Sequence, residues 1–149
     1  MRGLTFSICL TLFTACGGEG RPHSPESEIR AWVDRGEAAA EAKDRGDLLD
    51  MISLDYADAR GNSHEDIGKI LRIYFFRQNT IALLTNIDSI AMMGDTAAMV
   101  DVTVGMVGTN NRVLGLSADA YRFEFELEKL ADEWVLIGAR WGKLGSDLR

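Results

Sequence analysis

Two aspartates and a tyrosine lie close together in the chain and could carry general acid–base chemistry. Asp55, Tyr56 and Asp58 fall in a segment, residues 54–62, that has neither helical nor strand periodicity. A carboxylate in apolar surroundings has its pKa raised towards neutral pH, and a tyrosine hydroxyl can stabilise an enolate-like oxygen. The same residue types are typical of a loop, in which the aspartates make Asx turns and the Tyr56 ring packs over the core. We favour the loop interpretation and keep the catalytic one as its alternative.

Histidine, metal and cofactor chemistry have little support in the sequence. The two histidines are His23 and His64, and His64 falls in the first turn of a predicted helix, where we expect an exposed side chain. A catalytic His–Asp pair would have to use His64. No His-x-His or Glu-x-x-His motif occurs, and no glycine-rich nucleotide loop or Gly-x-Ser-x-Gly motif occurs. The sequence therefore predicts no metal site and no cofactor.

The composition is that of one ordinary globular domain with an acidic surface. The chain has 149 residues, 46% of them hydrophobic, and a formal net charge of -7. An acidic balance opposes binding to nucleic acid, which needs a basic face, so no nucleic-acid partner is expected. Both cysteines, Cys9 and Cys16, lie in the first sixteen residues. Neither cysteine can form a disulfide within the predicted globular domain.

The first fifteen residues have the features of a signal peptide. Arg2 is their only charged residue, and their apolar core is about half as long as a bilayer-spanning helix requires. The stretch Leu12-Phe13-Thr14-Ala15-Cys16 resembles the lipobox of bacterial lipoproteins, which implies that Cys16 is lipidated and becomes the new amino terminus. Ordinary cleavage after Ala15 is the alternative. Gly17, and not an aspartate, directly follows Cys16, and in this respect the sequence resembles lipoproteins that are passed to the outer membrane of Gram-negative bacteria.

These observations predict a protein held in the bacterial cell envelope by an acyl anchor, at the outer membrane facing the periplasm. Residues 16–24 are rich in glycine and contain the first proline, and they are expected to form a flexible tether. The remaining chain, residues 25–143, is long enough for one hydrophobic core. Residues 144–149 are expected to form a C-terminal tail.

Three helices are predicted first. Ser24-Pro25-Glu26 is a typical helix start, and we expect the first helix to end at Gly46, with Asp47 capping a short second helix. Residues 63–66 form a capping box for a third helix. Its apolar stripe has helical spacing and consists of Ile67, Ile70, Leu71, Tyr74 and Phe75.

From Thr80 onward the hydrophobic period changes to two, which predicts strands. The expected strands are residues 81–93, 96–107, 119–130 and 134–143. The connection at residues 109–117 is unusually apolar, which fits a strand extension, a lid or a dimer contact. The predicted fold class is α+β, with three N-terminal helices packed on a curved antiparallel sheet of four main strands.

The order of these elements, the Asp44-Arg45-Gly46-Asp47 joint, the Asp55-Tyr56 segment and the closing residues 132–141 together resemble the NTF2-like superfamily, also called SnoaL-like. The resemblance implies a cone, of the kind also called cystatin-like, around an apolar cavity. It also implies a homodimer through the sheet. Isomerases, cyclases, dehydratases, ligand binders and interaction domains use this scaffold, so the fold does not choose the function.

The resemblance to the enzymes of this superfamily implies a carboxylate that projects into the cone, sometimes with a tyrosine or histidine beside it. The candidates for these catalytic roles are Asp55, Tyr56, Asp58 and His64. The residues expected to line a pocket, with the core as their alternative place, are Trp32, Tyr56, Tyr74, Phe76 and Phe123. Arg72 and Arg77 fit either an anionic ligand or a solvated helix face. The leading expectation is binding of a small apolar ligand or an envelope protein. The alternatives are an isomerase or dehydratase using Asp58 or Asp55 with Tyr56, and an accessory structural lipoprotein.

Overall fold

The computed structural model describes residues 24–110 and 116–149. The predicted signal peptide, Cys16 and most of the tether lie outside the described residues. Three helices precede four strands: α1 (Pro25–Glu41), α2 (Arg45–Asp50), α3 (His64–Arg77), β1 (Gln78–Met93), β2 (Ala97–Asn110), β3 (Leu116–Leu130) and β4 (Glu133–Lys143). No helix among the described residues is long and apolar enough to cross a membrane.

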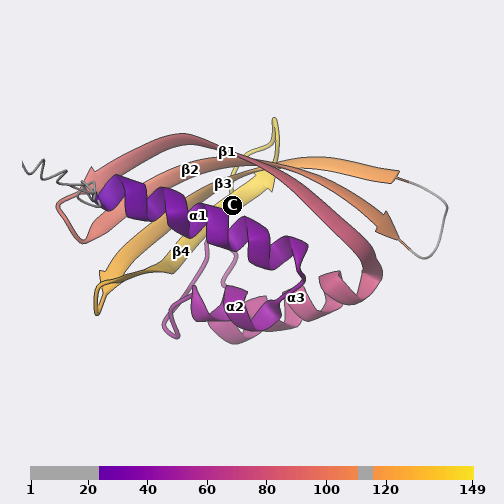
Figure 1. Cartoon of the computed structure of the whole chain (residues 1–149), viewed down its shortest axis with the longest axis horizontal. Coiled ribbons are helices and arrows are strands. Elements are labelled where there is room, and N and C mark those ends of the chain that lie inside the picture. Colours follow the sequence, from indigo (N-terminus) through magenta and orange to yellow (C-terminus); the bar gives the residue numbers. More distant parts are fainter. Residues whose placement is uncertain (1–23, 111–115) are drawn as a thin grey trace, which may run out of the picture.

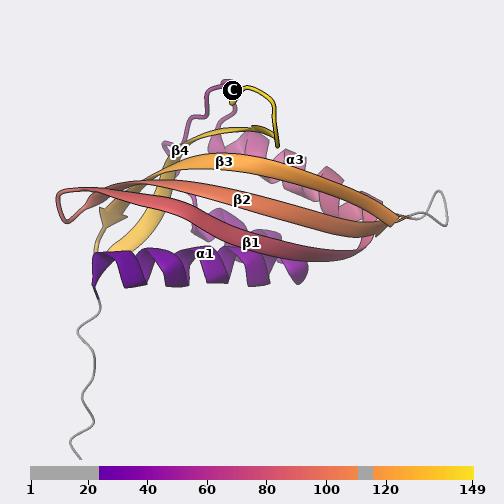
Figure 2. The same cartoon turned by 90° about the horizontal axis from the view of Figure 1, so that it is seen from above.

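The four strands form one antiparallel sheet in the order β1-β2-β3-β4. The sheet curves strongly, with α1 lying along the strands and α2 and α3 grouped near the start of β1 (Figures 1 and 2). The predicted fold class is confirmed. β2 and β3 extend further than predicted and take in residues 109–110 and 116–117 of the apolar connection, whose other residues lie outside the described ones.

The helix starts agree with the sequence analysis, but the joint between the first two helices does not. The side chain of Ser24 caps α1, and Ser63 with Asp66 forms the predicted capping box of α3. The expected end of the first helix at Gly46 is wrong, because α1 ends at Glu41 and Lys43 takes a left-handed conformation with φ 55°. Asp44, not Asp47, caps α2 by accepting a hydrogen bond from the amide of Asp47 at 3.0 Å.

The core lies between α1 and the middle of the sheet. Ile29 of α1 packs with Val100 and Val102 of β2 and Leu127 of β3, and all four are almost fully buried. Polar contacts hold the same helix to β3 and β4: Glu28 accepts hydrogen bonds from Lys129 Nζ of β3 at 2.7 Å and from Trp134 Nε1 of β4 at 2.9 Å.

The apolar stripe predicted for α3 is less buried than expected, and of its residues Ile67 packs against this core. Ile70 is 43% exposed, and Gly68 is the buried residue of the helix. The reason is the place of α3, which packs against α2 and the start of β1. A methyl group on Gly68 would lie 3.4 Å from Leu49 Cδ1, so the two helices approach closely there.

Two segments cover the free edge of β4. The first is the irregular segment, in which the amides of Ser53, Ala57 and Ala59 donate to carbonyl groups of β4 at 2.9, 3.2 and 3.1 Å. The second is residues 144–149, which fold back so that Arg149 and Trp141 exchange main-chain hydrogen bonds of 3.0 and 3.3 Å. The edge is therefore closed to further pairing along both stretches.

Candidate ligand-binding site

A row of aromatic rings crosses the concave side of the sheet. Tyr121, Phe123 and Phe125 alternate along β3 and so share a face. Phe123 pairs with Trp141 of β4, and their rings stack with centroids 6.2 Å apart at 22°. Phe125 lies 5.3 Å from Phe123 and meets Trp32 of α1 edge-on at 5.8 Å. We call these five residues the aromatic wall.

The aromatic wall differs from the core in its exposure. All five of its residues are partly buried, whereas the neighbouring Val100, Val102 and Leu127 are almost completely buried. Flat, partly exposed rings on a concave face are the surface on which planar apolar molecules stack.

One donor in the wall is buried and unused. Trp32 Nε1 has no hydrogen-bond partner in the described part of the chain. Leaving a buried donor unpaired costs about 1–3 kcal/mol. A ligand carrying an acceptor at this point would remove that cost.

Tyr74 of α3 lies near Tyr121 of the aromatic wall. Its hydroxyl donates to Met106 Sδ at 3.9 Å, and burial, with Tyr121 and Asp119 nearby, raises the pKa of Tyr74. The phenol is therefore neutral and able to donate. Asp119 pairs with Lys143 at 2.9 Å on the exposed rim, and the sequence analysis did not single out either residue.

The carboxylate of Asp58 accepts its hydrogen bonds from residues of the same loop. It is 8% exposed and accepts hydrogen bonds from the Asn62 amide at 2.8 Å, from Asn62 Nδ2 at 2.7 Å and from the Arg60 amide at 2.9 Å. Burial by itself raises the pKa of Asp58, but the hydrogen bonds from Asn62, Arg60 and the Trp141 side chain more than offset it and lower the pKa. Asp58 is therefore an ionised acceptor that organises a turn and orients Trp141.

The other catalytic candidates lie in three different environments. Tyr56 is 4% exposed within the core, where burial first and Asp58 second raise the pKa of its phenol. Asp55 is exposed, and its amide bonds to Ser53 Oγ at 3.2 Å. His64 Nε2 lies 3.3 Å from the carbonyl oxygen of Leu49 and so links α3 to α2. The structure brings Asp58 and Tyr56 together and leaves Asp55 and His64 apart from them.

The candidate ligand-binding residues also separate. Trp32 and Phe123 lie in the aromatic wall, Tyr74 lies near Tyr121 of that wall, and Tyr56 lies in the core. Phe76 is 87% exposed on α3 and belongs neither to the wall nor to the core.

Arg60 completes the surroundings of Trp141. Its guanidinium carbon lies 3.5 Å from the centroid of the Trp141 ring, and Arg60 Nη2 donates to the Trp141 carbonyl at 2.9 Å. Nothing in the sequence around Arg60 signals this contact, because the two residues are 81 positions apart. Within residues 24–110 and 116–149, no group of three or more histidine, cysteine and acidic residues could hold a metal ion.

Comparison with known proteins supports the fold. No protein-family model and no curated protein matches the sequence. Among solved structures, a candidate scytalone dehydratase from Novosphingobium aromaticivorans superposes with a TM-score of 0.73 at 12% identity, covering 83% of this chain and 85% of that one. A ketosteroid isomerase-like protein from Erwinia carotovora gives 0.66 at 15% identity, covering 79% and 95%. A candidate dehydratase of the NTF2-like family from Streptomyces avermitilis gives 0.69 at 10% identity, covering 80% and 95%.

Three helices against one strongly curved antiparallel sheet, with rings on its concave side, define an open α+β cone. The protein has the NTF2-like fold, as the resemblance in its sequence indicated.

Proposed function

We propose that this protein is a lipid-anchored envelope protein whose domain binds a small, planar, apolar molecule against the aromatic wall. The observation that carries the ligand proposal is the partial exposure of five neighbouring aromatic rings beside a core that is otherwise well buried. A domain that used these rings only for its own packing would bury them more completely.

Two polar groups set the chemistry of the ligand. The unpaired Trp32 Nε1 favours a molecule with a hydrogen-bond acceptor, such as a carbonyl oxygen. The neutral Tyr74 hydroxyl, near Tyr121, donates to Met106 Sδ, a weak acceptor that a ligand oxygen would replace. Because most of the contact is ring against ring, apolar area supplies the larger part of the affinity.

The anchor proposal depends on the sequence around Cys16. A lipidated Cys16 would hold the domain through residues 17–24, which reach at most about 28 Å when fully extended. This reach lets the acidic domain stay clear of the head groups. A triacylated cysteine anchors durably without a basic patch, since each buried methylene contributes roughly 0.8 kcal/mol.

The geometry favours binding over the enzymatic alternative. The structural neighbours include proteins named as a dehydratase and an isomerase-like protein, and an enzyme of that kind would need a free carboxylate beside the wall. The oxygens of Asp58 already accept hydrogen bonds from Asn62 and Arg60, and Asp119 is paired with Lys143 on the rim.

Native mass spectrometry of the full chain extracted from its own envelope tests both parts of the proposal. We expect the mass of a protein lipidated at Cys16, with a further small-molecule adduct. Cys16→Ser should remove the lipid mass and release the protein from the membrane fraction. Phe123→Ala should reduce the adduct, because it removes the central ring of the wall.

Phe76→Ala is the matched control, since it makes the same chemical change on an exposed helix face. Equal loss of the adduct in both variants, or no adduct in the wild type, contradicts ligand binding at the wall. An unlipidated mass contradicts the anchor. The expected homodimer remains a prediction, and a monomer in the same spectrum counts against it.

A further inference from the structure

An apolar stripe crosses the outer side of α3, away from the side that packs against α2. Gly68 is the buried residue of the helix, and its backbone faces Leu49 of α2. Ile70, Ile73 and Phe76 follow one another at intervals of three residues and are 43%, 48% and 87% exposed. Residues at this spacing form a ridge on the surface of a helix. We call these three residues the α3 ridge, and Figure 1 shows α3 at the lower border of the molecule.

The charged side chains of α3 change sign along the helix. Glu65 and Asp66 lie in its first turn, and Arg77 lies in its last. Lys69 is paired with both acids, at 2.9 and 3.3 Å, whereas the Arg77 side chain has no ion pair with any described residue. The helix therefore presents an acidic end, the α3 ridge and a basic end in that order.

We propose that α3 is an interface between two copies of this chain, in which the two α3 helices cross antiparallel. With the crossing point between Ile70 and Ile73, Ile70 of one copy lies against Ile73 of the other. The same register brings Arg77 of one copy beside Glu65 and Asp66 of the other, at both ends of the helix pair. This arrangement is self-complementary, because a two-fold axis makes each contact twice. It is independent of a ligand at the aromatic wall and of the lipid anchor.

The outer side of the sheet, away from α1 and the aromatic wall, is less suited to a contact between two copies. The charged residues that the strand alternation places there include Asp101, Glu124, Glu126, Arg122 and Arg140. Both arginines are already paired, Arg122 with Asp101 at 3.3 Å and Arg140 with Glu124. Two copies meeting at this face would therefore bring acids against acids, and like charges that lie opposite each other are destabilising. The acid-to-base order along α3 avoids this repulsion.

Sedimentation equilibrium of the full chain in density-matched detergent tests the interface. We expect a reversible monomer–dimer equilibrium at micromolar concentrations, since two short helix faces form a small interface. Phe76→Ala should raise the dissociation constant by about tenfold, because it removes the most exposed ring of the α3 ridge from both copies. Leu84→Ala is the matched control, since Leu84 is 78% exposed on the outer side of the sheet, and it should leave the constant unchanged. A protein that stays monomeric overturns the proposal, and so does a dimer that Leu84→Ala weakens and Phe76→Ala does not.

Charge reversal tests the antiparallel register. Arg77→Glu should weaken the dimer by about tenfold, because it places an acid beside Glu65 and Asp66 of the other copy. Glu65→Lys alone should also weaken it, through repulsion from Arg77 of the other copy. The two changes together should restore most of the affinity, because each new charge then faces its opposite. Arg30→Glu, the same reversal at an exposed position of α1, is the control and should change the dissociation constant by no more than about twofold. A combined variant that dimerises no better than either single variant overturns the proposal.

Discussion

Asp58 illustrates how a single residue can serve the site without reacting. Its carboxylate accepts hydrogen bonds from Asn62 and Arg60 in its own turn and from the indole of Trp141 across the fold. Trp141 is therefore held at its edge by Asp58 and covered by the Arg60 guanidinium. Because Trp141 stacks on Phe123, Asp58 acts on the aromatic wall as a positioning residue.

The lowered pKa of Asp58 predicts how stability depends on pH. In the folded protein its pKa lies below the ordinary value of 3.8, so the unfolded chain binds a proton more readily. The stabilising contribution is complete above that ordinary value and is lost as the pH falls through the lower, folded pKa. We expect Asp58→Asn to reduce the free energy of unfolding at neutral pH by about 1.5–3 kcal/mol. It should also flatten the acid limb of a stability curve measured by urea unfolding.

Asp55→Asn is the control for this prediction, because Asp55 is exposed and three positions away. It should leave both the neutral-pH stability and the acid limb close to those of the wild type. An acid limb that is unchanged in Asp58→Asn would show that other carboxylates dominate the pH dependence.

At this scale the sequence predicts local chemistry but not distant partners. The irregular segment 54–62 and the turn-forming character of Asp58 can be read from residue types alone. The contacts of Asp58 and Arg60 with Trp141 cannot be, because they join positions far apart in the chain. Trp32 and Phe123 could be proposed as pocket residues from their type, although their arrangement in one wall could not.

At the scale of the element, the start of α3 is determined by local sequence, whereas the burial of its residues is determined by tertiary packing. Its start follows from four consecutive residues: Ser63 Oγ accepts from the Asp66 amide at 3.3 Å and donates to Asp66 Oδ2 at 2.8 Å. Its burial does not follow from its own pattern, since Ile70 belongs to the predicted core stripe and is nevertheless 43% exposed. The position of α2 and β1 decides which face of α3 is covered.

The capping box gives a second prediction. Ser63→Ala should lower the free energy of unfolding by about 1 kcal/mol, because it leaves the Asp66 amide without its side-chain acceptor. Thermal or urea unfolding measures the change. Ser63→Thr retains both the acceptor and the hydroxyl donor at the cap and should keep most of the wild-type stability. A loss as large as that of Ser63→Ala would contradict the capping explanation.

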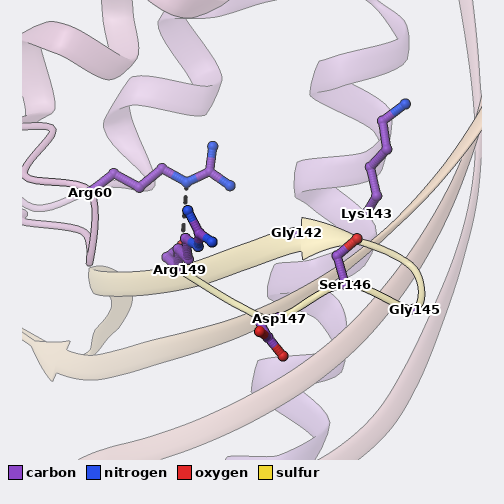
Figure 3. Close-up of a pocket in the computed structure, with 7 residues that line it drawn as sticks. All are labelled: Arg60, Gly142, Lys143, Gly145, Ser146, Asp147 and Arg149. Carbon is purple, nitrogen blue, oxygen red and sulfur yellow. Dashed lines mark hydrogen bonds between the residues drawn. The ribbon is translucent and has the colours of Figure 1, made fainter.

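At the scale of the whole molecule, the C-terminal residues matter more than a tail would. They close the edge of β4, accept a hydrogen bond from Arg60 and, together with Arg60 and Lys143, line an open depression (Figure 3). The expected tail at residues 144–149 is thus in contact with the domain. Gly142 makes this contact feasible, since a methyl group there would lie 2.8 Å from the main-chain oxygen of Asp147.

Gly142→Ala should therefore displace the C-terminal segment. We expect a loss of about 1–3 kcal/mol in the free energy of unfolding, from a clash with backbone atoms that cannot rotate away. Hydrogen exchange of the Trp141 amide, which donates to Arg149, should become faster. Unchanged exchange at Trp141 would contradict the prediction.

Gly36→Ala is a control of opposite sign. The added methyl group would meet only the flexible Met51 Cε, at 3.4 Å, and α1 would lose a residue that is unfavourable within a helix. We expect it to raise the free energy of unfolding by about 0.5–1 kcal/mol.

The sequence by itself determined the α+β class, the order of the elements and the capping of α1 and α3. Each of these depends on residues that are neighbours in the chain or that repeat with a fixed period. Only the tertiary structure decided that Ile70 of α3 is exposed, that Asp58 bonds to Trp141 and that the C-terminal residues return to β4. These features depend on how the curved sheet brings segments together that are far apart in the chain. No local sequence pattern specifies which of those segments come into contact.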